Sequence, residues 1–204
     1  MKKNWQLEAD LGHVKIWETP NVKLEQYPTS PHVAAMLVQL ASGTYGDIEG
    51  KNITDLGCGG GILGIAALLM GAEHVTFVDI DDAVLEIAKE NVALFELTDQ
   101  ATFINQDVSE LSVPETDVVI MNPPFGTKRK GIDVVFLEQA CKIGPVVYSL
   151  HKMSTDEFLV RKVVSWGCKA TVAAHVSFDI PAMYKFHKKG KVAVEVSLIR
   201  IERG

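Results

Sequence analysis

The sequence has no long apolar run and no repeated or low-complexity segment. A helix that spans a membrane needs roughly 20 consecutive apolar residues, and no stretch approaches that length. The first residues, Met1 to Gln6, also lack the apolar core of a signal peptide. These absences predict a protein that is located inside the cell.

Cysteine is scarce. The 204 residues contain three, Cys58, Cys141 and Cys168, which lie far apart. Their spacing matches no zinc-binding pattern, and an odd number fits a reducing compartment better than a disulfide framework. We therefore expect three free thiols and no metal site.

Basic residues are not in excess. The chain has 20 Lys and Arg and 26 Asp and Glu, which gives a net charge of −6. A protein that binds nucleic acid with its whole surface is usually basic. Either the substrate is small, or the basic residues are concentrated locally, or a partner contributes. The length and the ordinary globular composition predict one domain over residues 1–204.

Strand-like and helical patterns alternate along the chain. Seven short apolar runs predict strands, at residues 52–56, 74–79, 101–104, 117–121, 145–150, 170–178 and 192–201. The last two follow each other without a helix and should pair antiparallel. The order predicts an α/β fold, with a Rossmann-like, mainly parallel seven-stranded sheet, an antiparallel C-terminal strand and helices on both faces.

The strand at 117–121 ends in an unusual turn, Asn122-Pro123-Pro124-Phe125. Two consecutive prolines remove two backbone N–H donors and fix two φ angles, so the strand cannot continue through them. The Asn122 side chain and the proline carbonyl groups are then held at the end of the strand, beside the Phe125 ring. We predict that these four residues are catalytic. They would accept hydrogen bonds from a planar NH₂ group while the ring stacks on its plane.

A glycine-rich loop, Asp55-Leu56-Gly57-Cys58-Gly59-Gly60-Gly61, joins the first strand to an apolar helix. Glycines let a ligand approach the backbone closely. The loop lacks the Gly-Lys-Ser/Thr of ATPase phosphate loops, and Ile62 stands where the nicotinamide fingerprint requires its last glycine. It resembles instead the Asp-x-Gly-x-Gly-x-Gly loop of S-adenosylmethionine-dependent methyltransferases, which implies S-adenosylmethionine as the cofactor.

This resemblance assigns roles to further residues after the strands. Asp79 would bind the ribose hydroxyls, and Asp107 with Val108 would meet the adenine of the cofactor. Because the turns at Gly57, Asp79 and Asn122 all follow predicted parallel strands, they should converge at one edge of the sheet. The other cofactor-binding residues that the resemblance implies are Gln26, Thr29, Asp55, Gly57, Gly59, Gly60, Ile62 and Asn122.

Three segments narrow the resemblance: Leu-Glu-Gln-Tyr-Pro-Thr at 24–29, Tyr-Ser-Leu-His-Lys at 148–152 and Tyr-Lys-Phe-His-Lys-Lys at 184–189. Together with the Asn-Pro-Pro-Phe turn, they resemble the eukaryotic methyltransferase-like family that makes N6-methyladenosine in small-subunit (18S) ribosomal RNA. The resemblance runs from about residue 20 to 201. It implies an N-terminal extension at 1–45 that closes over the cofactor, and a Rossmann-like core at 50–202.

The same resemblance implies a partner and a location. Such enzymes work as heterodimers with a small zinc-binding methyltransferase activator subunit, seated near the short third strand. We expect that strand to lie at a sheet edge, where unpaired backbone groups invite a partner. The resemblance further implies a location in the nucleus and cytoplasm. Gly60 stands where a cysteine is expected in close relatives, a change that a backbone-contacting loop tolerates.

Two basic stretches supply local positive charge despite the acidic total. We predict that they bind RNA phosphates. Their residues are Lys128, Arg129 and Lys130 in the first, and Lys185, His187, Lys188 and Lys189 in the second. His151 and His187 have no companion Cys or acid at ligand spacing, so we do not expect them to bind a metal.

Other functions fit parts of this pattern. Glutamine also presents a planar NH₂ group, so a protein glutamine N5-methyltransferase of the release-factor type is an alternative. Those enzymes typically carry a larger helical N-terminal domain and a Tyr where Phe125 stands. DNA adenine methylation would call for a separate target-recognition domain. A non-catalytic RNA-binding scaffold of methyltransferase descent would be expected to lose Asn122, Asp79 or the glycines, which are all present.

Overall fold

The computed structural model describes residues 2–17, 20–181 and 191–204, with only the backbone of residues 178–181 and 191–194. The strands are β1 (Asn52–Leu56), β2 (His74–Asp79), β3 (Ala101–Asn105), β4 (Val118–Met121), β5 (Val146–Lys152), β6 (Cys168–Pro181) and β7 (Lys191–Arg203). The helices are α1 (Asn4–Leu11), α2 (Pro31–Tyr45), α3 (Ile62–Leu69), α4 (Asp82–Leu94), α5 (Ile132–Ile143) and α6 (Asp156–Ser165). Short 3-10 helices are η1 (Val22–Leu24), η2 (Thr98–Gln100), η3 (Val108–Glu110) and η4 (Met153–Thr155).

The seven strands form one sheet in the order β3-β2-β1-β4-β5-β7-β6. Strands β1 to β5 are parallel to their neighbours, and β7 is antiparallel to both β5 and β6. The predicted mixed sheet is therefore confirmed, including the antiparallel pair at its C-terminal end. The last two strands are longer than predicted, because the hairpin continues pairing as far as Pro181 and Lys191.

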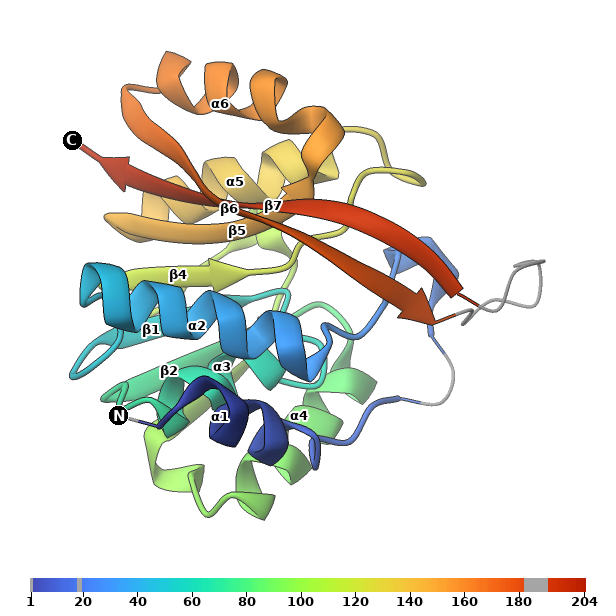
Figure 1. Cartoon of the computed structure of the whole chain (residues 1–204), viewed down its shortest axis with the longest axis vertical. Coiled ribbons are helices and arrows are strands. Elements are labelled where there is room, and N and C mark those ends of the chain that lie inside the picture. Colours follow the sequence, from blue (N-terminus) through green and yellow to red (C-terminus); the bar gives the residue numbers. More distant parts are fainter. Residues whose placement is uncertain (1, 18–19, 182–190) are drawn as a thin grey trace.

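Helices cover both faces of the sheet. One core cluster joins α1, α2, α3 and α4 to one face, and a second joins α5 and α6 to the other. Figure 1 shows α1, α2 and α3 over β1, β2 and β4, and α5 and α6 beside the strands of the C-terminal half. Because both faces are covered, β1, β2, β4 and β5 are buried almost throughout, whereas β3 at the edge of the sheet is only half-buried.

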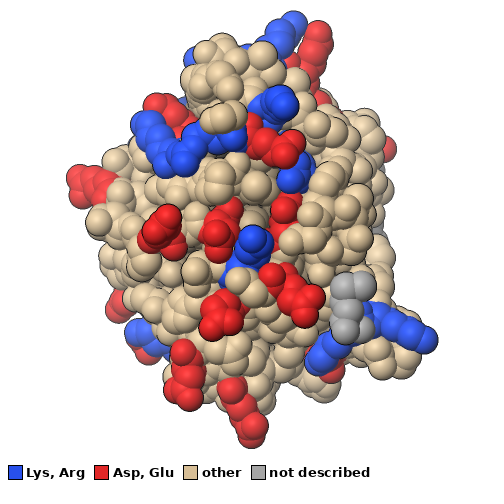
Figure 2. Space-filling model, turned by 90° about the vertical axis from the view of Figure 1, so that its left-hand side faces the viewer, with Lys and Arg blue, Asp and Glu red and all other residues tan. Residues whose placement is uncertain are grey.

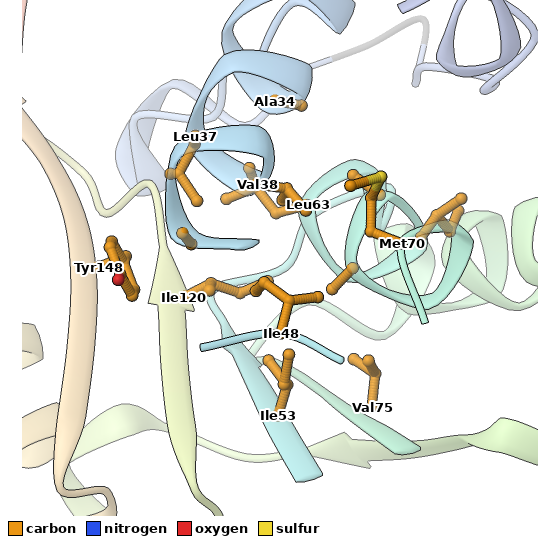
Figure 3. Packing of buried hydrophobic residues seen from close by; sticks show 14 of the residues in the cluster. Ala34, Leu37, Val38, Ile48, Ile53, Leu63, Met70, Val75, Ile120 and Tyr148 are labelled. Carbon is orange, nitrogen blue, oxygen red and sulfur yellow. The ribbon is translucent and has the colours of Figure 1, made fainter. Parts of the chain in front are cut away.

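The first core cluster holds the N-terminal helices against the sheet. Leu37 and Val38 of α2 lie above Ile53 of β1 and Ile120 of β4 (Figure 3), and all four side chains are buried. Burying one such side chain contributes about 1.5–3 kcal/mol. Helices α1 and α2, within residues 1–45, are therefore part of the packed core, and only the segment between them is free to cover a site.

Helix α2 begins with a defined cap. The Val33 amide donates to the Ser30 hydroxyl (3.3 Å), and Pro31 occupies the first helical position, where no N–H is needed. The helix ends at Gly46 in the left-handed conformation. This cap fixes the end of the segment 21–29, which we call the strap because it crosses the site described below.

No helix in the described ranges is long and apolar enough to cross a membrane. Across the same residues, no group of three or more His, Cys, Asp or Glu could hold a metal ion. All three cysteines are free and buried.

Candidate active site

An open pocket lies beyond the carboxyl ends of β1, β2, β3 and β4. Its empty volume, including the mouth, is about 890 Å³. The turns at Gly57, Asp79 and Asn122 meet in it. A smaller pocket of about 380 Å³ adjoins it, and the two share Trp17, Tyr27, Gly57, Gly59 and Asn122 in their walls.

The glycine loop needs its glycines for space as well as for backbone conformation. Gly57 and Gly59 have φ of 71° and 52°, in the left-handed region that side chains rarely adopt. A Cβ on Gly57 would lie 2.9 Å from Phe136, and one on Gly59 would lie 3.1 Å from Trp17. The bare backbone therefore forms part of the pocket wall, where a ligand can approach it.

Asp79 connects the loop to the second strand. One carboxylate oxygen accepts from the Gly59 amide (2.9 Å) and the other from the Asp81 amide (3.0 Å). Burial raises the pKa of Asp79, while these two hydrogen bonds act against that rise. Each oxygen keeps a second lone pair, and the residue lines the pocket, so it can still accept from ligand hydroxyls.

Asp55 lies behind the loop and is buried. Its Oδ2 atom accepts from the Gly64 amide in the first turn of α3 (2.8 Å), while Oδ1 is buried without a hydrogen-bond partner. Burial raises the pKa of Asp55 to about 7. The residue that the resemblance assigned to cofactor binding therefore lies outside the lining of both pockets and supports the helix behind the loop.

Other predicted cofactor residues do reach the pockets. Gln26, Asp107 and Val108 line the larger one, and Thr29, Gly60 and Ile62 line the smaller. Gln26 also donates to Asp81 (2.8 Å), which ties the strap to the start of α4. The Asp107 carboxylate accepts from the amide and the hydroxyl of Ser109, and these bonds lower its pKa.

The Asn122 side chain is held in one orientation. Its Nδ2 donates to the Thr29 hydroxyl (2.8 Å), so its Oδ1 is turned the other way, where it accepts from the Tyr27 hydroxyl (2.9 Å). The same hydroxyl lies 3.5 Å from the Pro123 carbonyl oxygen, which it also contacts as a donor. Two acceptor oxygens, Asn122 Oδ1 and Pro123 O, therefore converge on one point. We call them the acceptor pair.

The Tyr27 hydroxyl contacts both oxygens of the acceptor pair, a position that the sequence did not predict for it. The Tyr27 ring lies 5.1 Å from the Phe125 ring, tilted by 42°. Burial, and secondarily the charge of Glu25, raise the pKa of Tyr27 well above its usual value, so its hydroxyl stays a donor at neutral pH. The resemblance singles out Gln26 and Thr29 in the strap but gives no role to Tyr27, because a single sequence does not show which strap side chain reaches a turn 95 positions later.

Glu25 binds the loop that follows the catalytic turn. Its carboxylate accepts from the Thr127 amide (3.0 Å), the Thr127 hydroxyl (2.6 Å) and the Lys128 amide (2.7 Å), with the Arg129 amide at 3.4 Å. Burial by itself raises the pKa of Glu25, but these hydrogen bonds outweigh it, and the pKa is lowered. The carboxylate therefore stays charged in this cradle of backbone amides.

The first basic stretch lies at this site. Lys128, Arg129 and Lys130 are exposed, and Arg129 lines the larger pocket. The Nζ atom of Lys152, at the end of β5, lies 5.6 Å from the centre of the Phe125 ring. The second predicted stretch, Lys185, His187, Lys188 and Lys189, lies outside the described residues. Figure 2 shows the side of the molecule at the amino ends of the parallel strands, away from the site, where acidic and basic side chains are intermixed.

Two buried side chains, His151 and Trp17, differ in whether their polar atoms have a hydrogen-bond partner. His151 is fully buried beside the Ser149 hydroxyl (2.6 Å), and burial lowers its pKa to about 3, so it is a neutral core residue. Trp17 lines both pockets, and its buried indole N–H has no hydrogen-bond partner. No motif within the first 20 residues indicates a site, so Trp17 was not predicted to line a pocket.

Comparisons with known proteins decide the family. The chain matches the methyltransferase small domain over residues 34–143. The chain belongs to this methyltransferase family. The zebrafish (Danio rerio) rRNA N(6)-adenosine-methyltransferase METTL5 is 42% identical over 200 residues, which are 96% of each chain. The Drosophila melanogaster rRNA N(6)-adenosine-methyltransferase Mettl5 is 40% identical over 205 residues, 98% of this chain and 96% of the relative.

A crystal structure of a Pyrococcus horikoshii protein shows the same fold, with 35% identity, a TM-score of 0.89 and coverage of 100% of this chain and 97% of the other. The small-domain methyltransferase described here is therefore an enzyme, and S-adenosylmethionine is its methyl donor. The residues fit that donor. The glycine loop leaves bare backbone, Asp79 offers acceptors, and the Trp17 indole N–H is a buried donor without a partner.

Proposed function

We propose that this methyltransferase transfers a methyl group to N6 of a specific adenosine in small-subunit (18S) ribosomal RNA. Two lines support the proposal. The names of the zebrafish and Drosophila relatives give rRNA adenosine N6 as their target, and these relatives match the chain over nearly its whole length. The acceptor pair with Phe125 beside it suits a planar aromatic amine.

One observation carries the proposal. A single Tyr27 hydroxyl contacts both Asn122 Oδ1 (2.9 Å) and Pro123 O (3.5 Å), which means that both oxygens face the same small volume. An exocyclic NH₂ group has two N–H donors and can satisfy both oxygens at once. The Phe125 ring beside the pair offers a surface for the base, and stacking on an aromatic ring contributes roughly 1–3 kcal/mol.

The acceptor pair addresses the chemical difficulty of the substrate. The N6 lone pair of adenine is delocalised into the ring, so the amine is a weak nucleophile. As the nitrogen attacks, it becomes pyramidal and gains positive charge. Asn122 Oδ1 and Pro123 O stabilise that charge more than the planar ground state, which lowers the barrier. No base is needed until the methylated nitrogen releases a proton.

The bound S-adenosylmethionine supplies the methyl group from its sulfonium, so the activation lies in the donor. The chain would position the donor. Asp79, whose carboxylate accepts from the Gly59 amide, would also accept from the ribose hydroxyls of the donor, and the bare backbone of Gly57 and Gly59 would permit close contact. The target adenosine must leave its stack to reach Asn122, which favours a single-stranded or flipped nucleotide.

We also propose that a small zinc-binding activator subunit covers the β3 edge. Strand β3 is the first in the sheet order, so one side of its backbone is unpaired within the described sheet. Asn105, its last residue, donates to the carbonyl of Ile80 (3.0 Å), so this end of the edge adjoins the larger pocket. A partner strand would pair with the unpaired side of β3. If the isolated protein is an active, monodisperse monomer that neither binds the added subunit nor gains activity from it, this assignment is wrong.

The function is tested by offering the enzyme a choice. The protein, with and without the activator subunit, is incubated with methyl-labelled S-adenosylmethionine and small-subunit rRNA, DNA or release factor. We expect label in RNA, and N6-methyladenosine after nuclease digestion. Label found only in release factor would contradict the proposal and favour glutamine N5 methylation.

A further inference from the structure

Three consecutive backbone amides behind the catalytic turn form a site for an anion. The amides of Thr127, Lys128 and Arg129 all point at the Glu25 carboxylate, at 3.0, 2.7 and 3.4 Å, and the Thr127 hydroxyl adds a bond of 2.6 Å. Gly126, with φ of 72°, starts the turn that brings them together. Successive amides that converge in this way bind carboxylates and phosphates alike. We call these three amides the nest.

The surroundings of the nest favour a phosphate over a carboxylate. The Lys128, Arg129 and Lys130 side chains are exposed beside it, so an anion there gains from three nearby cations. The nest also follows Asn122-Pro123-Pro124-Phe125 directly in the chain. A phosphate in it would therefore lie next to the place where the proposed target base binds.

The strap fills both places with its own side chains. Glu25 occupies the nest, and two residues later the Tyr27 hydroxyl occupies the acceptor pair, with its ring beside Phe125. Two residues of chain span at most about 7 Å between Cα atoms. A carboxylate and an aromatic ring so closely linked match the relation between the phosphate and the base of one nucleotide.

Taken with the proposed function, on which this inference rests, we propose that the nest is a subsite for an RNA phosphodiester next to the target adenosine. Glu25 and Tyr27 occupy the phosphate and base positions until RNA displaces them together. The backbone of Glu25 supports this exchange. Its φ of 53° lies in the left-handed region, which a non-glycine residue seldom adopts. The contacts of its carboxylate hold that conformation, and a competing phosphate would release it.

The proposal predicts that weakening the strap strengthens RNA binding. If RNA binds only when the strap has left, the apparent dissociation constant is the intrinsic one divided by the open fraction. Glu25→Gln removes the charge that the nest holds, and Tyr27→Phe removes the donor from the acceptor pair. Each raises the open fraction. Because both contacts hold one segment closed, their free energies add, so the double variant should gain about the product of the single gains until the strap is fully open.

The test measures the affinity of the full-length chain for a fluorescent single-stranded 12-mer of uridine with one central adenosine, by anisotropy at fixed salt. We expect Glu25→Gln to bind about 3–10-fold more tightly than the unmodified protein. Glu115→Gln is the matched control, because it removes the same charge from an exposed residue before the amino end of β4. A Glu25→Gln affinity that equals the control, or falls below the unmodified protein, would overturn the proposal.

A spectroscopic readout separates displacement from a loss of folding. In amide nuclear magnetic resonance spectra, RNA should shift the Thr127, Lys128 and Arg129 signals of the unmodified protein. Unmoved signals in RNA-bound protein would overturn the subsite. Methylation assays on the same samples distinguish the two proposals. RNA methylation without any Glu25 effect defeats the subsite alone, whereas an absence of both RNA methylation and RNA binding defeats both.

Discussion

In the cofactor half of the pocket, Asp55, Asp79 and the glycine loop are held by contacts between residues close in sequence, whereas the acceptor half depends on residues far apart. Asp55 bonds an amide 9 positions later, and Asp79 bonds an amide 20 positions earlier. Asn122, by contrast, is fixed by Thr29 and Tyr27, which are 93 and 95 positions away. One half is a strand–loop–helix unit, and the other is a turn completed by the strap.

This difference assigns different duties to the two halves. The contact between Asp79 and the glycine loop does not involve the strap, so the methyl donor should still bind there when the strap moves, without the part of the pocket wall that Gln26 supplies. The acceptor half changes if the strap moves, because its orienting and occupying side chains all come from residues 25–29. We therefore expect substitutions in the two halves to affect separate quantities.

The largest difference between the effect on turnover and the effect on donor affinity is expected for Asn122→Ala. The change removes one oxygen of the acceptor pair, and turnover should fall by about 10²–10³-fold or more, as for other transition-state acceptors and donors. Affinity for S-adenosylmethionine, measured by calorimetry, should change by less than about threefold. Asn4→Ala, at the exposed start of α1, is the control. A parallel loss of turnover and donor affinity would show that the two halves are not independent.

Asp55→Asn tests the cofactor half through stability. Burial raises the pKa of Asp55 from its ordinary value of 3.8 to about 7. Between these two pH values, the folded protein therefore holds a proton that the unfolded chain has released. Unfolding free energy is therefore lost as pH rises from about 4 to 7, by at most about 4 kcal/mol. The Asn variant lacks this loss, and its oxygen can still accept from Gly64.

The measurement compares denaturant unfolding at pH 5 and pH 8. The stability of Asp55→Asn relative to the unmodified protein should be higher at pH 8 than at pH 5. Asp99→Asn, on the surface in η2, should follow the unmodified protein at both values. Parallel pH dependences for Asp55→Asn and the unmodified protein would mean that Asp55 does not carry this penalty.

The same contrast explains how far the sequence could predict the site. The strands, the glycine loop and Asp79 follow from local patterns, since a strand followed by glycines and a helix specifies its own geometry. Tyr27 lies inside a segment that the resemblance singled out, yet its contact with Asn122 depends on the path of the strap across the folded sheet. Trp17 has no local signal at all, because its role depends on packing against Gly59.

Asp55 shows the opposite case, a residue that the family motif assigned to the cofactor and that the fold buries behind the loop. The acid that opens the glycine loop was assigned to the cofactor because it belongs to the family motif. In the fold, the strand direction points it at the Gly64 amide behind the loop. A motif identifies residues that belong to one site, but only the fold shows which of them are accessible to the ligand and which are buried behind it.

A smaller effect, confined to the affinity for S-adenosylmethionine, is expected for Asp79→Asn. An amide has one acceptor oxygen, so one of the bonds from Gly59 and Asp81 is lost, and an NH₂ group faces an N–H donor. Charge-assisted hydrogen bonds contribute about 1.5–3 kcal/mol, which predicts a 10–100-fold loss of donor affinity. Turnover at saturating donor should change little. Asp82→Asn, at the exposed start of α4, is the control. Reduced turnover with intact donor affinity would contradict the division of the site.

The smallest and most discriminating change is Thr29→Val, which keeps the shape of the side chain and removes the oxygen that accepts from Asn122 Nδ2. The amide can then rotate, and its oxygen leaves the acceptor pair for part of the time. One net hydrogen bond contributes about 1 kcal/mol, so turnover should fall about fivefold.

Thr29→Ser restores a hydroxyl at the same position and should recover most of that turnover. Steady-state turnover and calorimetric donor affinity, measured on both variants, assign the residue to one half of the site. Since Thr29 also lines the smaller pocket beside Gly60 and Ile62, it has access to the donor as well. If the Val variant weakens donor binding and leaves turnover intact, Thr29 serves the cofactor, and the orientation of Asn122 must be maintained by Tyr27 alone.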